Sequence, residues 1–93
     1  LPRQGVYFTR GRINGNNLYG MCNLGVRPTF DETDFVMEVH FFEKSIGDLY
    51  EKEINIEFLE RIREEKKFKD SSELKKQLEK DKNVCKQLIQ KYH

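Results

Sequence analysis

The sequence has no tryptophan, two prolines and two cysteines among its 93 residues. Cys22 and Cys85 stand alone, without a Cys-x-x-Cys spacing or a histidine cluster, so neither a zinc site nor a disulfide framework is predicted. Two isolated cysteines are typical of small buried hydrophobic residues. No apolar run approaches the roughly 20 residues that cross a bilayer, and the first residues lack the apolar core of a signal peptide. We therefore expect a cytoplasmic protein.

An excess of charge of one sign is also missing. Seventeen basic and sixteen acidic residues leave a net charge of +1, which favours neither a nucleic-acid partner nor an anionic membrane. A hydrophobic fraction of 37% with 35% charged residues is typical of one globular domain with a single modest core. The chain does not begin with methionine and opens on what reads as a strand edge, so we expect a piece of a longer polypeptide. Walker-type phosphate loops, Gly-x-Gly-x-x-Gly, His-Glu-x-x-His and Gly-x-Ser-x-Gly motifs are absent.

Hydrophobic patterning predicts four strands, over residues 5–10, 18–24, 35–42 and 53–58. Asn14 to Asn17 accept positive φ and predict a hairpin between the first two strands. From Asp70 the period changes to three and four, which predicts an amphipathic helix of about twenty residues with a solvated charged face. Asp70 or Ser71 is the expected cap, with Glu73 in a capping-box position. Since closure removes strand edges, we expect a small, closed or nearly closed antiparallel barrel with one C-terminal helix.

The third predicted strand carries the first candidate for chemistry. Its alternation places Val36, Glu38, His40 and Phe42 on one face. Apolar neighbours can raise the pKa of a carboxyl group toward neutrality, so Glu38 is a candidate general base that accepts a hydroxyl proton. The alternative is an ordinary surface glutamate on a solvent-facing strand.

A loop expected over residues 23–30 is the second candidate. Gly25 permits close backbone approach to a ligand, Pro28 fixes the turn, and Asn23 and Thr29 offer polar side chains. The alternative is a plain connector.

The segment 59–68, ahead of the helix, is the third candidate. Arg63, Lys66 and Phe68 could hold a flat heteroaromatic ligand, because an arginine beside an aromatic ring both stacks and donates hydrogen bonds. The alternative is a charged helical turn in which Phe68 packs against Leu74.

Five linked segments together resemble the riboflavin kinase module, which in bacteria is usually the C-terminal half of a bifunctional riboflavin kinase/FAD synthetase. These segments are residues 1–7 (Leu-Pro-x-x-Gly-Val-Tyr), 23–30, 38–40, 47–50 (Gly-Asp-Leu-Tyr) and 61–68. The resemblance implies a six-stranded Greek-key β-barrel with a C-terminal helix. It also implies transfer of the ATP γ-phosphate to the ribityl 5′-hydroxyl of riboflavin, giving FMN, with Mg²⁺ as cofactor.

The same resemblance implies roles for individual residues. Glu38 matches the catalytic base. The positions that hold the flavin are matched by Arg63, Lys66 and Phe68. The positions around the nucleotide are matched by His40, Phe42 and Tyr50. The mobile flap is matched by Asn23, Gly25, Arg27, Pro28 and Thr29.

Two departures from the family pattern define what this piece is expected to lack. The Pro-Thr-Ala-Asn motif, whose Thr and Asn hold Mg²⁺ and the ATP phosphates, would lie before Leu1, and Pro28-Thr29 is followed by Phe30 instead. We therefore expect no metal ligand in these residues, an FMN adenylyltransferase domain earlier in the parent chain, and no kinase activity from the 93 residues alone. Glu51 also replaces the family's usual glycine. The competing hypothesis is a non-catalytic flavin-binding or regulatory barrel; a nucleic-acid-binding barrel is disfavoured by the charge balance.

Overall fold

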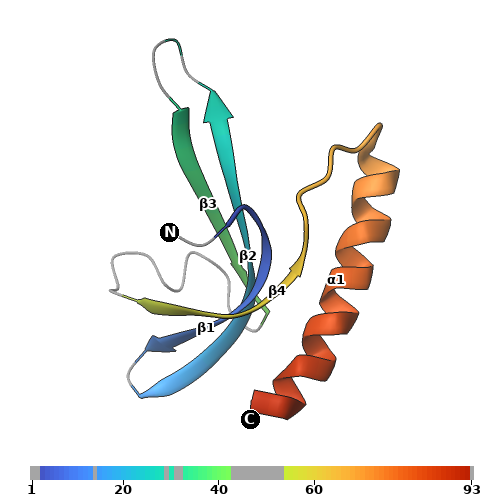
Figure 1. The fold of residues 1–93 in the computed structure, drawn as a ribbon. Coiled ribbons are helices and arrows are strands. Elements are labelled where there is room, and N and C mark those ends of the chain that lie inside the picture. The colour runs from blue at the N-terminus through green and yellow to red at the C-terminus, as the bar shows by residue number, and fades with distance from the viewer. Residues whose placement is uncertain (1–2, 14, 29, 31–32, 43–53, 93) are drawn as a thin grey trace.

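The computed structural model describes residues 3–13, 15–28, 30, 33–42 and 54–92. These residues form strands β1 (Gly5–Ile13), β2 (Asn16–Pro28), β3 (Thr33–Phe41) and β4 (Asn55–Arg63), followed by helix α1 (Ser71–Tyr92). All neighbouring strands are antiparallel, in the order β3-β2-β1-β4. Three consecutive strands with the fourth beside the first make a Greek key, and the helix lies along one side of it (Figure 1).

The predicted hairpin between the first two strands is confirmed. Ile13 pairs with Asn16 at the end of the ladder, and Gly15 in the turn has φ +79°. That left-handed conformation is open to glycine at no steric cost. Both strands run further than the pattern of apolar residues predicted.

One face of the sheet is concave, and side chains from its two edge strands meet there. Phe41 and Val39 of β3 pack with Leu18 and with Ile54, which directly precedes β4. A Cβ atom at Gly11 would lie 3.0 Å from the Phe41 ring and 3.1 Å from Ile54, so glycine is what allows this close approach. The curl makes the sheet barrel-like, and the predicted mainly β Greek-key fold with one C-terminal helix is confirmed.

The convex face is covered by the C-terminal half of α1. Phe8 and Tyr19 stack with ring centroids 5.6 Å apart and pack with fully buried Cys85, as expected for an isolated cysteine. In the N-terminal half of α1, by contrast, Leu74 and Leu78 are 39% and 42% exposed. The apolar stripe of the helix is therefore confirmed, but only its C-terminal half packs on the sheet.

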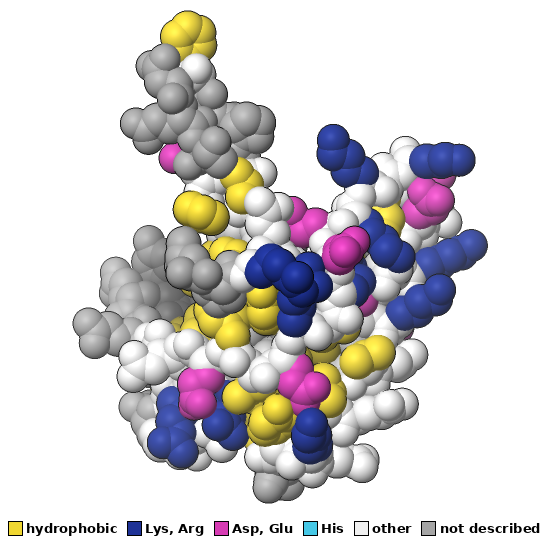
Figure 2. Space-filling model, viewed as in Figure 1, with side chains coloured by type: hydrophobic (Ala, Val, Ile, Leu, Met, Phe, Trp, Pro, Cys, Tyr) yellow, Lys and Arg dark blue, Asp and Glu magenta, His cyan; other side chains and the backbone are white. Residues whose placement is uncertain are grey.

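The opposite side of α1 is charged, as the sequence predicted. Lysine side chains of α1, which contains no arginine, gather over the outer surface of the helix (Figure 2). Within the described residues, no helix is both long and apolar enough to span a membrane.

The start of α1 follows the predicted capping pattern with a small change. Asp70 Oδ1 accepts a hydrogen bond from the Glu73 amide at 2.9 Å. Glu73 Oε2 accepts one from the amide of Lys69 at 2.8 Å, one residue earlier than in a standard capping box. Asp70 is therefore the cap, and the connection from β4 is tied to the first turn.

Strand β4 differs most from its prediction, which ended at residue 58. Its register against β1 shifts between Val6 and Tyr7 and again between Phe8 and Thr9. Each shift inserts an extra residue, Ile62 and Leu59, and a bulge of this kind reverses the alternation of faces. Both extra side chains pack toward the helix with Phe8. The helical turn considered as the alternative for residues 59–68 is wrong, because the strand continues to Arg63.

The predicted loop over residues 23–30 is also wrong for most of its length. Residues 23–28 are the last six of β2 and pair with residues 33–38 of β3. Gly25 pairs with Val36 inside the ladder, and Pro28 comes at the strand end, where a missing amide is tolerated. Thr29 lies outside the described residues.

Candidate functional site

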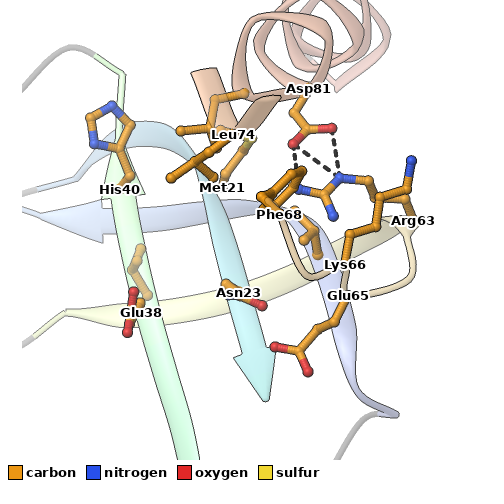
Figure 3. Close-up of a pocket in the computed structure, with 13 residues that line it drawn as sticks. Met21, Asn23, Glu38, His40, Arg63, Glu65, Lys66, Phe68, Leu74 and Asp81 are labelled. Atoms are coloured by element: carbon orange, nitrogen blue, oxygen red, sulfur yellow. Dashed lines mark hydrogen bonds and ion pairs between the residues drawn. The ribbon is translucent and has the colours of Figure 1, made fainter. Parts of the chain in front are cut away.

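A cavity of about 360 Å³ opens where the N-terminal half of α1 leaves the sheet. Strands β2 and β3 form one wall, α1 forms the other, and the segment after β4 closes one side (Figure 3). Its volume is within the usual range for small-molecule sites. The lining residues include Met21, Asn23, Glu38, His40, Arg63, Glu65, Lys66, Phe68, Leu74, Leu78 and Asp81.

The β-sheet wall brings together residues from two neighbouring strands. Glu38 pairs with Asn23, and His40 pairs with Met21. Since residues two apart on a strand share a face, all four side chains lie on the face toward α1. Glu38 and His40 are exposed, and both line the cavity. The candidate base is thus on the cavity wall.

The three positions expected around a nucleotide have different surroundings. His40 lines the cavity. Phe42 does not: it packs into the cluster of Phe8 and Cys85, with its ring edge-on to His40 at a centroid distance of 6.1 Å. Tyr50 lies outside the described residues. A nucleotide contact by these side chains stays a prediction.

Arg63 is held by an acidic partner on the helix. Its Nε donates to both oxygens of Asp81 at 2.9 and 3.0 Å, and its Nη2 donates to Oδ2 at 2.8 Å. Nη1 donates to the backbone carbonyl of Glu64 at 2.9 Å. The sequence placed Arg63 at a ligand site, but its acidic partner, 18 residues away, was not predicted. A flavin contact by Arg63 stays a prediction.

The polar contacts continue along the same face of the helix to a lysine in the segment that follows β4. Gln77 donates from Nε2 to Asp81 Oδ1 at 2.9 Å, and its own carbonyl oxygen accepts from Lys66 Nζ at 3.2 Å. Arg63 and Lys66 are therefore both attached to α1 at one edge of the cavity. This leaves two cationic side chains on the lining, next to a neutral amide and a paired carboxylate.

Apolar side chains form the rest of the helical wall. Half-buried Phe68 precedes α1, and Leu74 and Leu78 follow one helical turn apart. Half-exposed leucines beside an aromatic ring cost free energy in water, so an apolar ligand would be stabilised by covering them. The helical wall thus combines an apolar part with the charged edge formed by Arg63, Asp81 and Lys66, and the opposite wall at β3 carries Glu38 and His40.

Of the residues predicted for the flap, some line the cavity or the space beside it and others lie at the end of β2. Asn23 lines the cavity, and Gly25 lines an adjoining hollow of about 190 Å³. Arg27 and Pro28 belong to the end of β2, and nothing is described of their side chains. Among the described residues, no group of three or more His, Cys, Asp or Glu side chains could hold a metal ion.

A curled Greek-key sheet with a cavity beside its C-terminal helix defines a small, barrel-like β-domain. The chain belongs to the riboflavin kinase family, since the family model Flavokinase (riboflavin kinase) matches residues 1–89. It is similar to two proteins described as bifunctional riboflavin kinase/FMN adenylyltransferase. The Bacillus subtilis protein is 40% identical over 85 residues, covering 88% of this chain and 27% of its own length. The Haemophilus influenzae protein is 36% identical over 86 residues, covering 91% and 28%.

The structure is also similar to a solved one. A crystal structure titled as a macrolide-efflux protein from Streptococcus pneumoniae superposes with a TM-score of 0.84 at 30% identity, covering 92% of this chain and 28% of that one. The chain therefore spans little more than a quarter of the relatives it matches.

Proposed function

We propose that this domain phosphorylates riboflavin, transferring the γ-phosphate of ATP to the ribityl 5′-hydroxyl and releasing FMN and ADP. The observation that carries the proposal is the cavity that unites Glu38 with Phe68, Arg63 and Lys66. The sequence resemblance assigns Glu38 to the base, and Phe68, Arg63 and Lys66 to the flavin-holding positions. The chain's membership of the riboflavin kinase family supports that assignment. The cavity offers a flat ligand an apolar wall and places a carboxylate on the opposite wall.

In this mechanism the ligand is oriented by the two walls of the cavity. The isoalloxazine ring lies against Phe68, Leu74 and Leu78, which removes their apolar surface from water. The ribityl chain then runs toward β3. Glu38 accepts the proton of the 5′-hydroxyl as that oxygen attacks the γ-phosphorus, and the bond from phosphorus to the β-phosphate oxygen breaks.

The nucleotide is assigned to the side of the cavity that His40 lines, and the family resemblance also assigns Phe42 and Tyr50 to it. The family resemblance implies Mg²⁺ as well, held by a Pro-Thr-Ala-Asn segment. The described residues do not fit a metal ion, since they bring no three acidic, histidine or cysteine side chains together. Charge neutralisation on the phosphates is therefore assigned to no residue described in the structure.

The relatives are longer chains with two activities in their names. We propose that this domain likewise belongs to a cytoplasmic FAD synthetase, in which a linked FMN adenylyltransferase domain converts FMN to FAD.

The experiment that tests the kinase is product analysis. Full-length protein is incubated with riboflavin and Mg-ATP, and FMN and ADP are separated by chromatography. Equimolar FMN and ADP, dependent on ATP, supports the kinase. The competing function, a non-catalytic flavin-binding barrel, predicts quenching of riboflavin fluorescence on binding and no FMN.

A further inference from the structure

Glu65 is a second carboxylate at the site. It follows β4 in the segment that leads to α1, and its side chain lies across the backbone of Gly25 in β2. It lines the main cavity and also the adjoining 190 Å³ hollow, which shares Asn23 and Glu38 with the cavity. Figure 3 shows Glu38 and Glu65 on either side of Asn23.

The position of this carboxylate depends on the missing side chain at residue 25. A Cβ atom there would contact the Glu65 carboxylate directly and would lie 3.0 Å from its carboxyl carbon. The sequence suggested that Gly25 admits a ligand close to the backbone, but in the structure the protein's own side chain takes that space. Since Glu65 is exposed and flexible, an alanine at residue 25 would displace its carboxylate and not the strand.

We propose that Glu65 accepts a hydrogen bond from a secondary hydroxyl of the ribityl chain, so that it selects flavins that carry a polyol. This inference rests on the proposed function. The ring is assigned to the apolar wall of Phe68 and Leu74, and the reacting hydroxyl is assigned to Glu38. The polyol between them presents hydroxyl donors, and an ionised carboxylate has only acceptors to offer. Asn23, between the two carboxylates, can both donate and accept.

The test compares two ligands that share the ring and differ in the polyol: riboflavin, and lumiflavin, which has a methyl group in place of the ribityl chain. Each is titrated into full-length protein by fluorescence. Because hydrogen bonds to charged groups contribute more than neutral ones, Glu65→Gln should raise the Kd for riboflavin by roughly 10-fold and leave the Kd for lumiflavin unchanged. Glu64→Gln, the neighbouring exposed glutamate that lines neither space, is the control and should change neither value.

Gly25→Ala tests the same contact without removing the carboxylate. It should give the same selective loss of riboflavin affinity. In a double variant with Glu65→Gln, it should add little to the loss of riboflavin affinity, because both substitutions remove the same interaction. Equal weakening of riboflavin binding and lumiflavin binding would show that Glu65 does not contact the ribityl chain, and would overturn the inference. Unchanged riboflavin affinity in both single variants would also overturn it. Wild-type protein that binds neither ligand would overturn the proposed function itself.

Discussion

The guanidinium of Arg63 and the carboxylate of Asp81 join β4 to the middle of α1 by a bidentate ion pair, with Nη2 2.8 Å from Oδ2. Their side chains are only 15% and 2% exposed. The pair lies at the boundary between the packed C-terminal half of the helix, which begins near Cys85, and the unpacked half that carries Leu74 and Leu78. It therefore ties α1 to β4 at a point on the cavity lining.

The Asp81→Ala variant should unfold more easily than the wild-type protein. Removing one partner of a buried ion pair leaves the other charge uncompensated, which typically costs about 3–5 kcal/mol. We expect a loss of that order in the free energy of unfolding, measured by urea denaturation. Glu79→Ala, an exposed acidic residue on the same helix, is the control and should cost under about 1 kcal/mol. Equal effects of the two substitutions would show that the ion pair does not hold the helix.

The sequence predicts the secondary-structure elements better than it predicts the contacts between them. Alternation located the four strands, and the change of period at Asp70 located the helix and its cap. The bulges at Leu59 and Ile62 were not predictable, because an inserted residue reads as a break in alternation and so as the end of a strand. The loop predicted over residues 23–30 is wrong for residues 23–28 for a related reason. Gly25 reads as a turn residue, whereas in the structure it leaves room for the Glu65 side chain, which only the fold brings near.

The part of the candidate site that lies on a single strand, β3, could be predicted from the sequence. Glu38 and His40 share a face by period alone, and the structure places both on the cavity. Asp81 and Gln77 carried no local signal, since a charged face on a helix reads as solvated. In the structure Asp81 pairs with Arg63, 18 residues away, and Gln77 pairs with Lys66, 11 residues away.

Phe68→Ala should weaken riboflavin binding by roughly 1–3 kcal/mol, because the ring is half-buried on the cavity wall and would stack on the flavin. Flavin-fluorescence titration gives the affinity, and a thermal melt of the same variant reports any loss of packing. Unchanged affinity with a lower Tm would assign Phe68 to packing ahead of the helix and remove it from the ligand site.

The two cysteines should be inert in the folded protein. Burial raises the pKa of the Cys22 thiol to about 11, and burial, with a smaller contribution from the Asp81 charge, raises that of Cys85 to about 12. A thiol-reactive dye at pH 8 should therefore label neither cysteine in native protein and both in urea. Rapid labelling of native protein would contradict the buried positions.

The same shifts predict a loss of stability in alkali. Thiols in the unfolded state have a pKa of about 8.5. Between that pH and about 11, the native state therefore keeps thiol protons that the unfolded state releases. The free energy of unfolding should be unaffected by these groups below pH 8.5 and fall as the pH rises through that window. Urea midpoints between pH 8 and 11 measure the slope. A Cys22→Ala/Cys85→Ala double variant, less stable overall, should show a shallower one; equal slopes would contradict the assignment.

Glu38 is proposed as the base of a riboflavin kinase whose flavin site is the cavity beside it. The measurement is the rate of FMN formation by full-length Glu38→Gln protein, with riboflavin affinity determined on the same preparation. Glutamine keeps the size of the side chain but cannot take the proton, so FMN formation should fall by roughly 10²-fold or more while the Kd for riboflavin changes little. Turnover near that of the wild type, with riboflavin still bound, would contradict the account.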